Sequence, residues 1–467
     1  MKLLIAFVVL VLAGCSANSA DPSTTLVDGT IGSTVGPAPT TSNPQADSPK
    51  FGNPPAISDG PPTTEVEAAI DRLLTGLYTP DWDIEAIGDL ADLGDVRTAW
   101  LLADLMRFYQ TGLADAELVS AFSRLTDADQ DSSEVSFVWA MNHLIAWDLP
   151  AWAGYADAKR AIYIPVEELW QRFFDESIDL DWRLVTWGGV LADQRPLDDN
   201  SPCSCIPALD HPVTTDATGG DWYVADRIVF GVVVSDEAIA LPKHQMEVHE
   251  MVNLTLGGRE LGIPYCTLCA SAQAYYVDDV PGVDRVVLRT SGLLKRSNKL
   301  MYDLTTGSAI DTFTGSALTG PLAADGVTLE QVSVVAATWG DWKEAHPDTR
   351  ILAQDGGIGR SYQDDPLGAR DDGGPIFPVG PVDPRLPVQE EVVGVISPDD
   401  TPVAFPLNTT TAALADGPIE YEGLTVRLED SIRVYDSAGQ EVVSHGAFWF
   451  AWSQFHPNTI VWDPVGS

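Results

Sequence analysis

From residue 63 to residue 180, apolar residues recur at the spacing of one helix face. The region opens with the capping-box pattern Thr64-Glu65-Val66-Glu67, followed by apolar residues three or four positions apart. Gly94-Asp95 separates a second amphipathic stretch from a third. Two helices joined by a Gly-Asp turn are typical of HEAT-like repeats. We therefore expect a helical, HEAT-like domain over residues 63–180 that serves as a scaffold or docks a partner.

From residue 181 the pattern changes to short apolar runs rich in β-branched residues. Residues 227–234 (RIVFGVVV) and 285–288 (RVVL) are examples, and Gly, Pro and Asp residues separate such runs. Strands divided by turns predict a β-rich domain over residues 181–467. Together with the helical domain, this pattern predicts an α+β protein.

One motif occurs twice in the β-rich region. The residues Trp339, Trp342, His346, Pro347 and Thr349 have identical counterparts 110 positions later (449 against 339, for example), namely Trp449, Trp452, His456, Pro457 and Thr459. Such agreement in rare residues indicates a tandem duplication with a shortened second half. Because positions four apart share a helix face, we expect short helices whose tryptophans fill a β-layer and whose histidines bond locally.

The first residues have the pattern of a lipoprotein signal peptide. Lys2 precedes an apolar run, Leu3–Leu12, of about ten residues, which is too short to span a bilayer. The run ends in Leu12-Ala13-Gly14-Cys15, a lipobox. We expect residues 1–15 to be the signal peptide, Cys15 to carry the lipid, and the protein to be anchored extracytoplasmically to the cell membrane. Residues 16–62, which are rich in Ser, Thr, Pro and Gly, predict a disordered tether.

The charge of the chain limits its partners. There are 68 acidic and 26 basic residues, a net charge of −42. Phosphate binding needs clustered Lys and Arg, so nucleic acid is excluded as a partner. The sequence also lacks a P-loop, a G-x-G-x-x-G turn after a strand, an H-E-x-x-H motif and a nucleophile elbow. Whether the protein is an enzyme is left undecided.

The cysteines are the sharpest chemical signal. Cys266 and Cys269 form a C-x-x-C motif, which can close a disulfide, act as a redox pair or bind a soft metal. Cys203 and Cys205 lie only two positions apart, where a direct bridge is strained. We expect first two disulfides that join one pair to the other, and second a tetrahedral site of all four sulfurs for a soft metal such as Zn or Cu.

Two further residues are candidates for tuning the C-x-x-C thiols. His249 precedes the motif by one strand and a turn, and it can act as a third ligand or as a proton donor to a thiolate. The alternative is a histidine on a helix surface. Arg296 belongs to a cationic pair, Lys295-Arg296, in an otherwise acidic chain. Arg296 can lower a thiol pKa, or it can pair with one of the many carboxylates.

A series of short stretches in the second half of the chain carries a family resemblance. They are Ile206-Pro207-Ala208-Leu209-Asp210-His211-Pro212, His249-Glu250-Met251-Val252-Asn253, Tyr265-Cys266-Thr267-Leu268-Cys269, Ser291-Gly292-Leu293-Leu294 with Ser297-Asn298, Met301-Tyr302-Asp303 with Thr306-Gly307-Ser308, Gly320-Pro321-Leu322, Trp339-Gly340-Asp341-Trp342 and His346-Pro347-Asp348-Thr349. In these stretches residues 187–461 resemble the bacterial and archaeal family catalogued as domain of unknown function 3179.

The resemblance implies that Cys266, Cys269, His249 and Asn253 belong to the family pattern. Some relatives are catalogued as possible selenoproteins, and a selenocysteine in the thiol motif would favour redox chemistry. This chain departs from the usual family pattern C-P-L-C-G at Thr267 and Ala270, and relatives usually have no counterpart of the Cys203/Cys205 pair.

Two hypotheses for function follow. The first is a membrane-anchored lipoprotein that binds a small ligand or a protein partner, with a cleft between the duplicated halves. The second is a thiol-redox or metal-handling protein of the cell envelope that uses the C-x-x-C pair.

Overall fold

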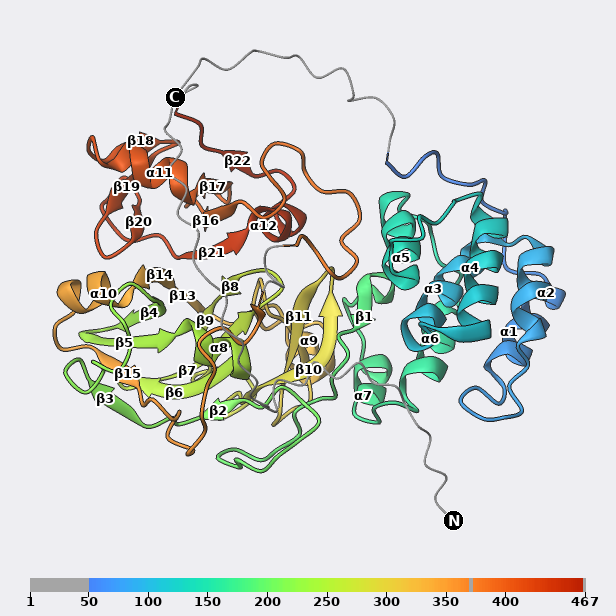
Figure 1. The fold of residues 1–467 in the computed structure, drawn as a ribbon, viewed down its shortest axis with the longest axis horizontal. Helices are drawn as coiled ribbons and strands as arrows, with labels where there is room; N and C mark the ends of the chain where they lie inside the picture. Colours follow the sequence, from blue (N-terminus) through green and yellow to red (C-terminus); the bar gives the residue numbers. More distant parts are fainter. Residues whose placement is uncertain (1–49, 369–372, 465–467) are drawn as a thin grey trace, which may run out of the picture. The chain divides into compact units, whose positions relative to one another are not determined.

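The structure is a computed structural model that describes residues 50–368 and 373–464 (Figure 1). Cys15, the expected signal peptide and most of the expected tether lie outside these residues. Every element named below lies within one compact unit that begins at Pro54. Among the described helices, none combines the length and the apolar character needed to cross a membrane.

The helical region begins one residue earlier than the capping-box pattern predicts. The cap is Thr63, whose hydroxyl accepts the Val66 N–H at 3.4 Å, and the buried face then holds Val66, Ile70 and Leu73. The helices are α1 (Thr64–Leu74), α2 (Glu85–Leu93), α3 (Ala99–Phe108), α4 (Gly112–Thr126), α5 (Ser136–Ala146), α6 (Tyr155–Tyr163) and α7 (Trp170–Asp175), with 3-10 turns η1 (Val96–Thr98) and η2 (Trp182–Leu184).

Buried polar contacts join the helical region to the β-rich region. Lys159 on α6 is fully buried, where its ammonium pairs with Asp104 on α3 at 2.8 Å and donates to the Val185 carbonyl at 2.6 Å. The indole of Trp170 on α7 donates to the Ser291 carbonyl at 2.8 Å. Because a buried charge without a partner is costly, these contacts fix the chain where it enters the first strand.

Three of the five sheets in the β-rich region lie before residue 360 (Figure 1). The first sheet has the strand order β1 (Val185–Trp187), β10 (Leu288–Lys295), β11 (Asn298–Asp303) and β12 (Ala309–Asp311). The second has the order β13 (Gln331–Val332), β9 (Ala274–Tyr276), β7 (Arg259–Cys266), β6 (Met251–Leu256) and β2 (Leu209–Asp210), and β8 (Ser271–Ala272) also pairs with β7. The third has the order β14 (Val335–Thr338), β4 (Ile228–Val234), β5 (Glu237–Pro242), β15 (Arg350–Leu352) and β3 (Thr214–Asp216).

The remaining sheets and the short helices complete the region. The sheets are β21 (Ser444–Phe448), β16 (Glu391–Ile396), β17 (Pro402–Pro406) and β22 (Ile460–Val461), and β18 (Ile419–Tyr421), β19 (Leu424–Leu428) and β20 (Ile432–Tyr435). The helices are α8 (Lys243–His249), α9 (Gly320–Ala324), α10 (Trp339–Ala345), α11 (Leu407–Leu414) and α12 (Trp449–Phe455). Helices first and sheets second confirm the expected α+β class.

The same four-stranded arrangement occurs twice. The order β14-β4-β5-β15 matches β21-β16-β17-β22, with antiparallel pairs followed by a parallel last pair in both. The indoles of Trp342 and Trp452 each donate to a threonine hydroxyl, Thr349 and Thr459 respectively, at 2.9 Å. The repeated motif therefore makes the same local structure in both places, and its tryptophans are buried.

Candidate functional site

Cys266 and Cys269 lie in the turn that joins β7 to β8. Cys266 ends β7 opposite Ser271 of β8, and the Cys269 N–H donates to the Cys266 carbonyl at 3.2 Å. Ala270 then has a φ of +48°, a left-handed conformation that glycine adopts without strain. This tight turn holds both sulfur atoms on the same side of the chain.

The two thiols are free and share one acceptor. Their sulfurs lie 3.9 Å and 3.6 Å from the Ser297 carbonyl oxygen in the β10–β11 turn, and a hydrogen bond joins the two thiols. Cys266 is 1% exposed and Cys269 is 0% exposed. Two unbridged sulfurs near one carbonyl oxygen, shielded from water, form a buried dithiol.

A buried ion pair lies beside this dithiol. The ammonium of Lys299 on β11 lies 3.3 Å from the Glu250 carboxylate and also donates to the Glu250 carbonyl. The hydroxyl of Thr267, between the cysteines, donates to the same carboxylate at 2.7 Å. Lys299 thus brings a positive charge to the thiols, and Thr267 links the turn to Glu250.

Opposing effects set the pKa values of the thiols. Burial raises the pKa of Cys266, but the hydrogen bond from Cys269 and the charge of Lys299 outweigh it, so this pKa lies below its ordinary value. Burial and the hydrogen bond to Cys266 raise the pKa of Cys269. The geometry therefore favours a thiolate at Cys266 and a thiol at Cys269, a division of roles typical of dithiol redox pairs.

The second repeated unit closes over the dithiol. The Phe448 N–H, at the end of β21, donates to the Cys269 carbonyl at 2.8 Å. Both cysteines belong to one apolar cluster with Trp449 and Trp452 of α12. The dithiol therefore lies where the β7–β8 turn meets β21 and the apolar cluster around α12.

His249 is buried but bonds elsewhere. Its Nδ1–H donates to the Pro207 carbonyl at 2.8 Å, and its Nε2 accepts the Tyr362 hydroxyl at 2.7 Å. Burial lowers the pKa of His249 to about 4, so the imidazole is neutral at pH 7. Both ring nitrogens are already hydrogen-bonded to groups other than the thiols, so the expected role of His249 as a ligand or proton donor to a thiolate is not formed.

Arg296 also lies apart from the expected role. Its backbone N–H donates to the Leu184 carbonyl at 3.0 Å, and the charges that act on its side chain are those of Asp181, Asp148 and Arg183. Burial lowers its pKa. The cation beside the thiols is Lys299, three residues further on.

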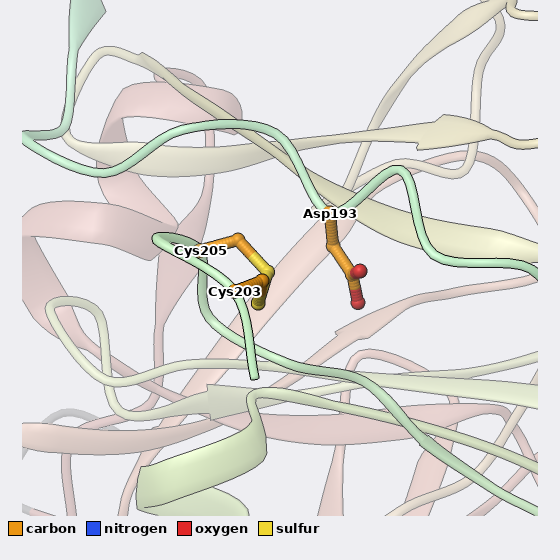
Figure 2. A group of neighbouring side chains, drawn as sticks. All are labelled: Asp193, Cys203 and Cys205. Carbon is orange, nitrogen blue, oxygen red and sulfur yellow. A yellow bond between two sulfur atoms is a disulfide. The ribbon is translucent and has the colours of Figure 1, made fainter. Parts of the chain in front are cut away.

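The structure corrects the expected cysteine pairing. Cys203 and Cys205 are bonded to each other (Figure 2), whereas Cys266 and Cys269 are free. Neither the two cross-bridges nor the four-sulfur metal site is formed. Because Cys203 and Cys205 are bonded to each other, neither is left to pair with Cys266 or Cys269, and those two thiols stay free.

One group in the described part of the chain is close enough to share an ion: Asp193, Cys203 and Cys205, whose ligand atoms lie within 4.8 Å of one another (Figure 2). The Asp193 carboxylate, however, already accepts Arg195 at 2.7 Å and 2.8 Å and the Ala208 N–H at 2.8 Å. The sulfurs are bonded to each other. In this state the group fits a metal poorly, since every ligand atom is engaged.

Asn253, another residue of the family pattern, supports the fold around the site. Its amide donates to Asp210 at 2.9 Å, and Asp210 forms a fully buried pair with Arg289 at 2.7 Å. The side chains of Asn253, Asp210 and Arg289 are thus linked by hydrogen bonds, and we assign Asn253 a structural role.

Sequence reasoning missed the two groups closest to the thiols, Lys299 and the Ser297 carbonyl. Both follow Arg296 in the β10–β11 hairpin, Ser297 in its turn and Lys299 on β11, so the only signal was their place at or next to the family pattern Ser297-Asn298. Which residue of a turn faces a distant strand depends on tertiary packing, and a local pattern does not contain that information.

Comparison with known proteins gives a match to a family model. Residues 203–429 match the family described as "Protein of unknown function (DUF3179)". No curated protein and no solved structure matches the chain.

Proposed function

Because residues 203–429 place the chain in a family described only as being of unknown function, we propose its function from the site: a thiol–disulfide redox protein that works through Cys266 and Cys269. The observation that carries the proposal is the pair of free thiols. They are hydrogen-bonded to each other, both lie near the Ser297 carbonyl oxygen, and the buried Lys299 lies beside them. A cysteine pair that served only as a staple would be oxidised outside the cytoplasm.

The chemistry is disulfide exchange with a small disulfide, RS–SR. The Cys266 thiolate attacks one sulfur of RS–SR and forms a mixed disulfide, and RS⁻ leaves. The Cys269 thiol then loses its proton and attacks the Cys266 sulfur, which releases the second RS⁻ and closes the Cys266–Cys269 bond. The two thiol protons of the protein end on two RSH molecules, so one disulfide is reduced and one dithiol oxidised.

The burial of the pair limits the reactant. At 1% and 0% exposure the sulfurs cannot meet a folded protein surface, so the reactant is small or the turn opens first. Lys299 favours the attacking thiolate, and Glu250 holds Lys299 in place.

A trapping experiment tests this assignment. With Cys269→Ser, a small disulfide reagent is expected to remain attached to Cys266, because the second attack is lost. Cys266→Ser, the matched control, is expected to label Cys269 much more slowly, because its pKa is raised. Peptide mass mapping reads both. Equal labelling of the two variants, or none of either, would overturn the assignment.

A second candidate function is ligand binding, and one observation favours it. A shallow hollow of about 460 Å³ in the helical region is lined by residues that include Trp152, Tyr155 and Trp182. Aromatic walls suit an apolar or planar ligand. The test is a fluorescence screen against Trp152→Ala, where a solute that quenches both proteins equally would count against a site there.

The lipid anchor on Cys15, the extracytoplasmic location and the tandem duplication are also proposed. The anchor rests on the lipobox and the apolar run before it. The duplication is supported by the matching strand orders and the matching Trp–Thr bonds. The HEAT-like character of the helices stays a prediction.

A further inference from the structure

We propose that Cys203–Cys205 is a second redox site, a surface disulfide that exchanges with an external dithiol. This goes beyond the function proposed for Cys266 and Cys269, and it rests on different residues. The two sulfurs are already bonded, and the pair lies in a loop in which Cys203 is exposed.

The Cys203–Cys205 disulfide constrains only a very short stretch of the chain. It joins residues two positions apart, so it closes a ring within a single turn. A disulfide stabilises mainly by restricting the unfolded chain, and that effect shrinks as the closed loop shortens. A structural role is therefore a poor explanation for this pair.

Other bonds hold the loop in place without the bridge. The Leu191 N–H donates to the Ser204 carbonyl at 3.0 Å, and the Thr290 hydroxyl donates to the Ile206 carbonyl at 2.9 Å. Arg195 donates to the Asp199 carbonyl at 2.9 Å, and His249 bonds the Pro207 carbonyl. These anchors on both sides of the cysteines let the sulfur–sulfur bond open while the surrounding chain keeps its path.

The two sulfurs differ in access. Cys203 is exposed and Cys205 is half-buried. An external thiolate therefore reaches Cys203 first, and Cys205 is the leaving sulfur. The surroundings are acidic, with Asp198 and Asp199 in the same loop, which favours an uncharged or cationic reductant over an anionic one.

The reaction balances with one dithiol. The external thiolate bonds to the Cys203 sulfur, the disulfide breaks, and Cys205 leaves as a thiolate. The second external thiol attacks the mixed disulfide, releases Cys203 and becomes part of an external disulfide. The two protons of the dithiol end on Cys203 and Cys205, which are reduced by two electrons while the dithiol is oxidised by two.

The test uses the full chain in buffers with graded ratios of reduced to oxidised dithiothreitol. Free thiols are alkylated at each ratio, and mass mapping counts the peptides with Cys203/Cys205 and Cys266/Cys269 separately. We expect the first pair to open and reclose reversibly while circular dichroism and tryptophan fluorescence are unchanged. A pair that opens only when the fold is lost would overturn the proposal.

A matched variant checks the structural alternative. Cys203→Ser with Cys205→Ser is expected to leave the unfolding midpoint unchanged. A large drop in that midpoint would show that the bridge is a staple and would contradict the proposal. Because each pair is read on its own peptide, failure here leaves the Cys266/Cys269 assignment standing, and the reverse also holds.

Discussion

At the scale of single residues, charge beside the buried dithiol decides which sulfur reacts. Burial alone would raise the pKa of both thiols. At Cys266 the hydrogen bond from Cys269 and the charge of Lys299 together reverse this, and Lys299 pairs with the Glu250 carboxylate at 3.3 Å. The asymmetry between two chemically identical side chains therefore comes first from their mutual hydrogen bond and then from the charge of Lys299 on a neighbouring hairpin.

Lys299→Met is expected to raise the pKa of Cys266 by about 1 unit, because an opposite charge nearby typically shifts a pKa by 1 to 3 units. The measurement is the pH dependence of Cys266 alkylation, read on its own peptide. Lys343→Met is the control, since Lys343 pairs with Asp221 at 3.1 Å on the exposed side of α10. An unchanged midpoint in the Lys299 variant, or an equal shift in both, would contradict the role of Lys299.

His249 makes stability depend on pH. Its pKa falls from 6.5 to about 4 on folding, so between these values the unfolded chain binds a proton that the folded chain does not. The contribution of the neutral imidazole to the free energy of unfolding is complete above pH 6.5 and is lost as the pH falls toward 4. His249→Gln should lower the slope of unfolding free energy against pH in this window by about 1.4 kcal/mol per unit. Denaturant titrations at several pH values measure the slope, and identical slopes in both proteins would refute the assignment.

The sequence pointed to Cys266 and Cys269 as candidates but did not reveal which groups surround them. The C-x-x-C spacing identified Cys266 and Cys269 because two thiols in one turn are a local pattern. The direct Cys203–Cys205 bond was set aside as strained, and the structure forms it because the local turn brings the α-carbons to 5.2 Å. Lys299 was missed because its contact with the thiols is made through a separate hairpin.

At the scale of elements, the repeated unit depends on one glycine and one tryptophan. A Cβ at Gly231 would lie 2.1 Å from the Trp342 ring, and a Cβ at Gly394 would lie 2.1 Å from the Trp452 ring. The ring therefore packs directly on the strand backbone in both halves. The two tryptophans were visible in the sequence as a repeat 110 positions apart, but the two glycines are 163 positions apart (394 against 231), so this contact could not be predicted.

Gly394→Ala is expected to destabilise the fold by about 1 to 3 kcal/mol, because the methyl group must displace a buried indole. Gly446→Ala is the control, since the nearest atom to its Cβ is 4.0 Å away in the same sheet. Guanidinium unfolding measures both. If the two variants lose equal stability, the indole is not the cause.

The strand orders themselves could not be predicted. Alternating apolar runs identify strands, and identical motifs indicate a repeat, but the partner of each strand depends on contacts between distant segments. The β7 strand, for example, pairs with β6, β8 and β9, and the pairing with β9 does not join neighbours along the chain.

At the scale of the whole molecule, the chain combines a net charge of −42 with a buried, charge-compensated site. So acidic a chain repels other acidic molecules. The two thiols lie away from this charge, in an apolar cluster with Trp449 and Trp452.

Cys15→Ala tests the proposed location. A lipid on Cys15 adds apolar chains that the acidic chain otherwise lacks, so the wild-type protein should partition into a detergent phase and the variant into the aqueous phase. Mass measurement of the mature N-terminus identifies the lipid. Equal partitioning of both proteins would rule out the anchor.

The central claim is that Cys266 and Cys269 interconvert between dithiol and disulfide within the folded protein. Its most direct test is an equilibrium titration of the wild-type chain from reducing to oxidising thiol buffer, with the Cys266–Cys269 bond counted by peptide mass mapping at each step. We predict a reversible two-electron transition with no loss of tryptophan fluorescence. If both thiols stay free under oxidising conditions, or are oxidised only as the protein unfolds, the account is contradicted.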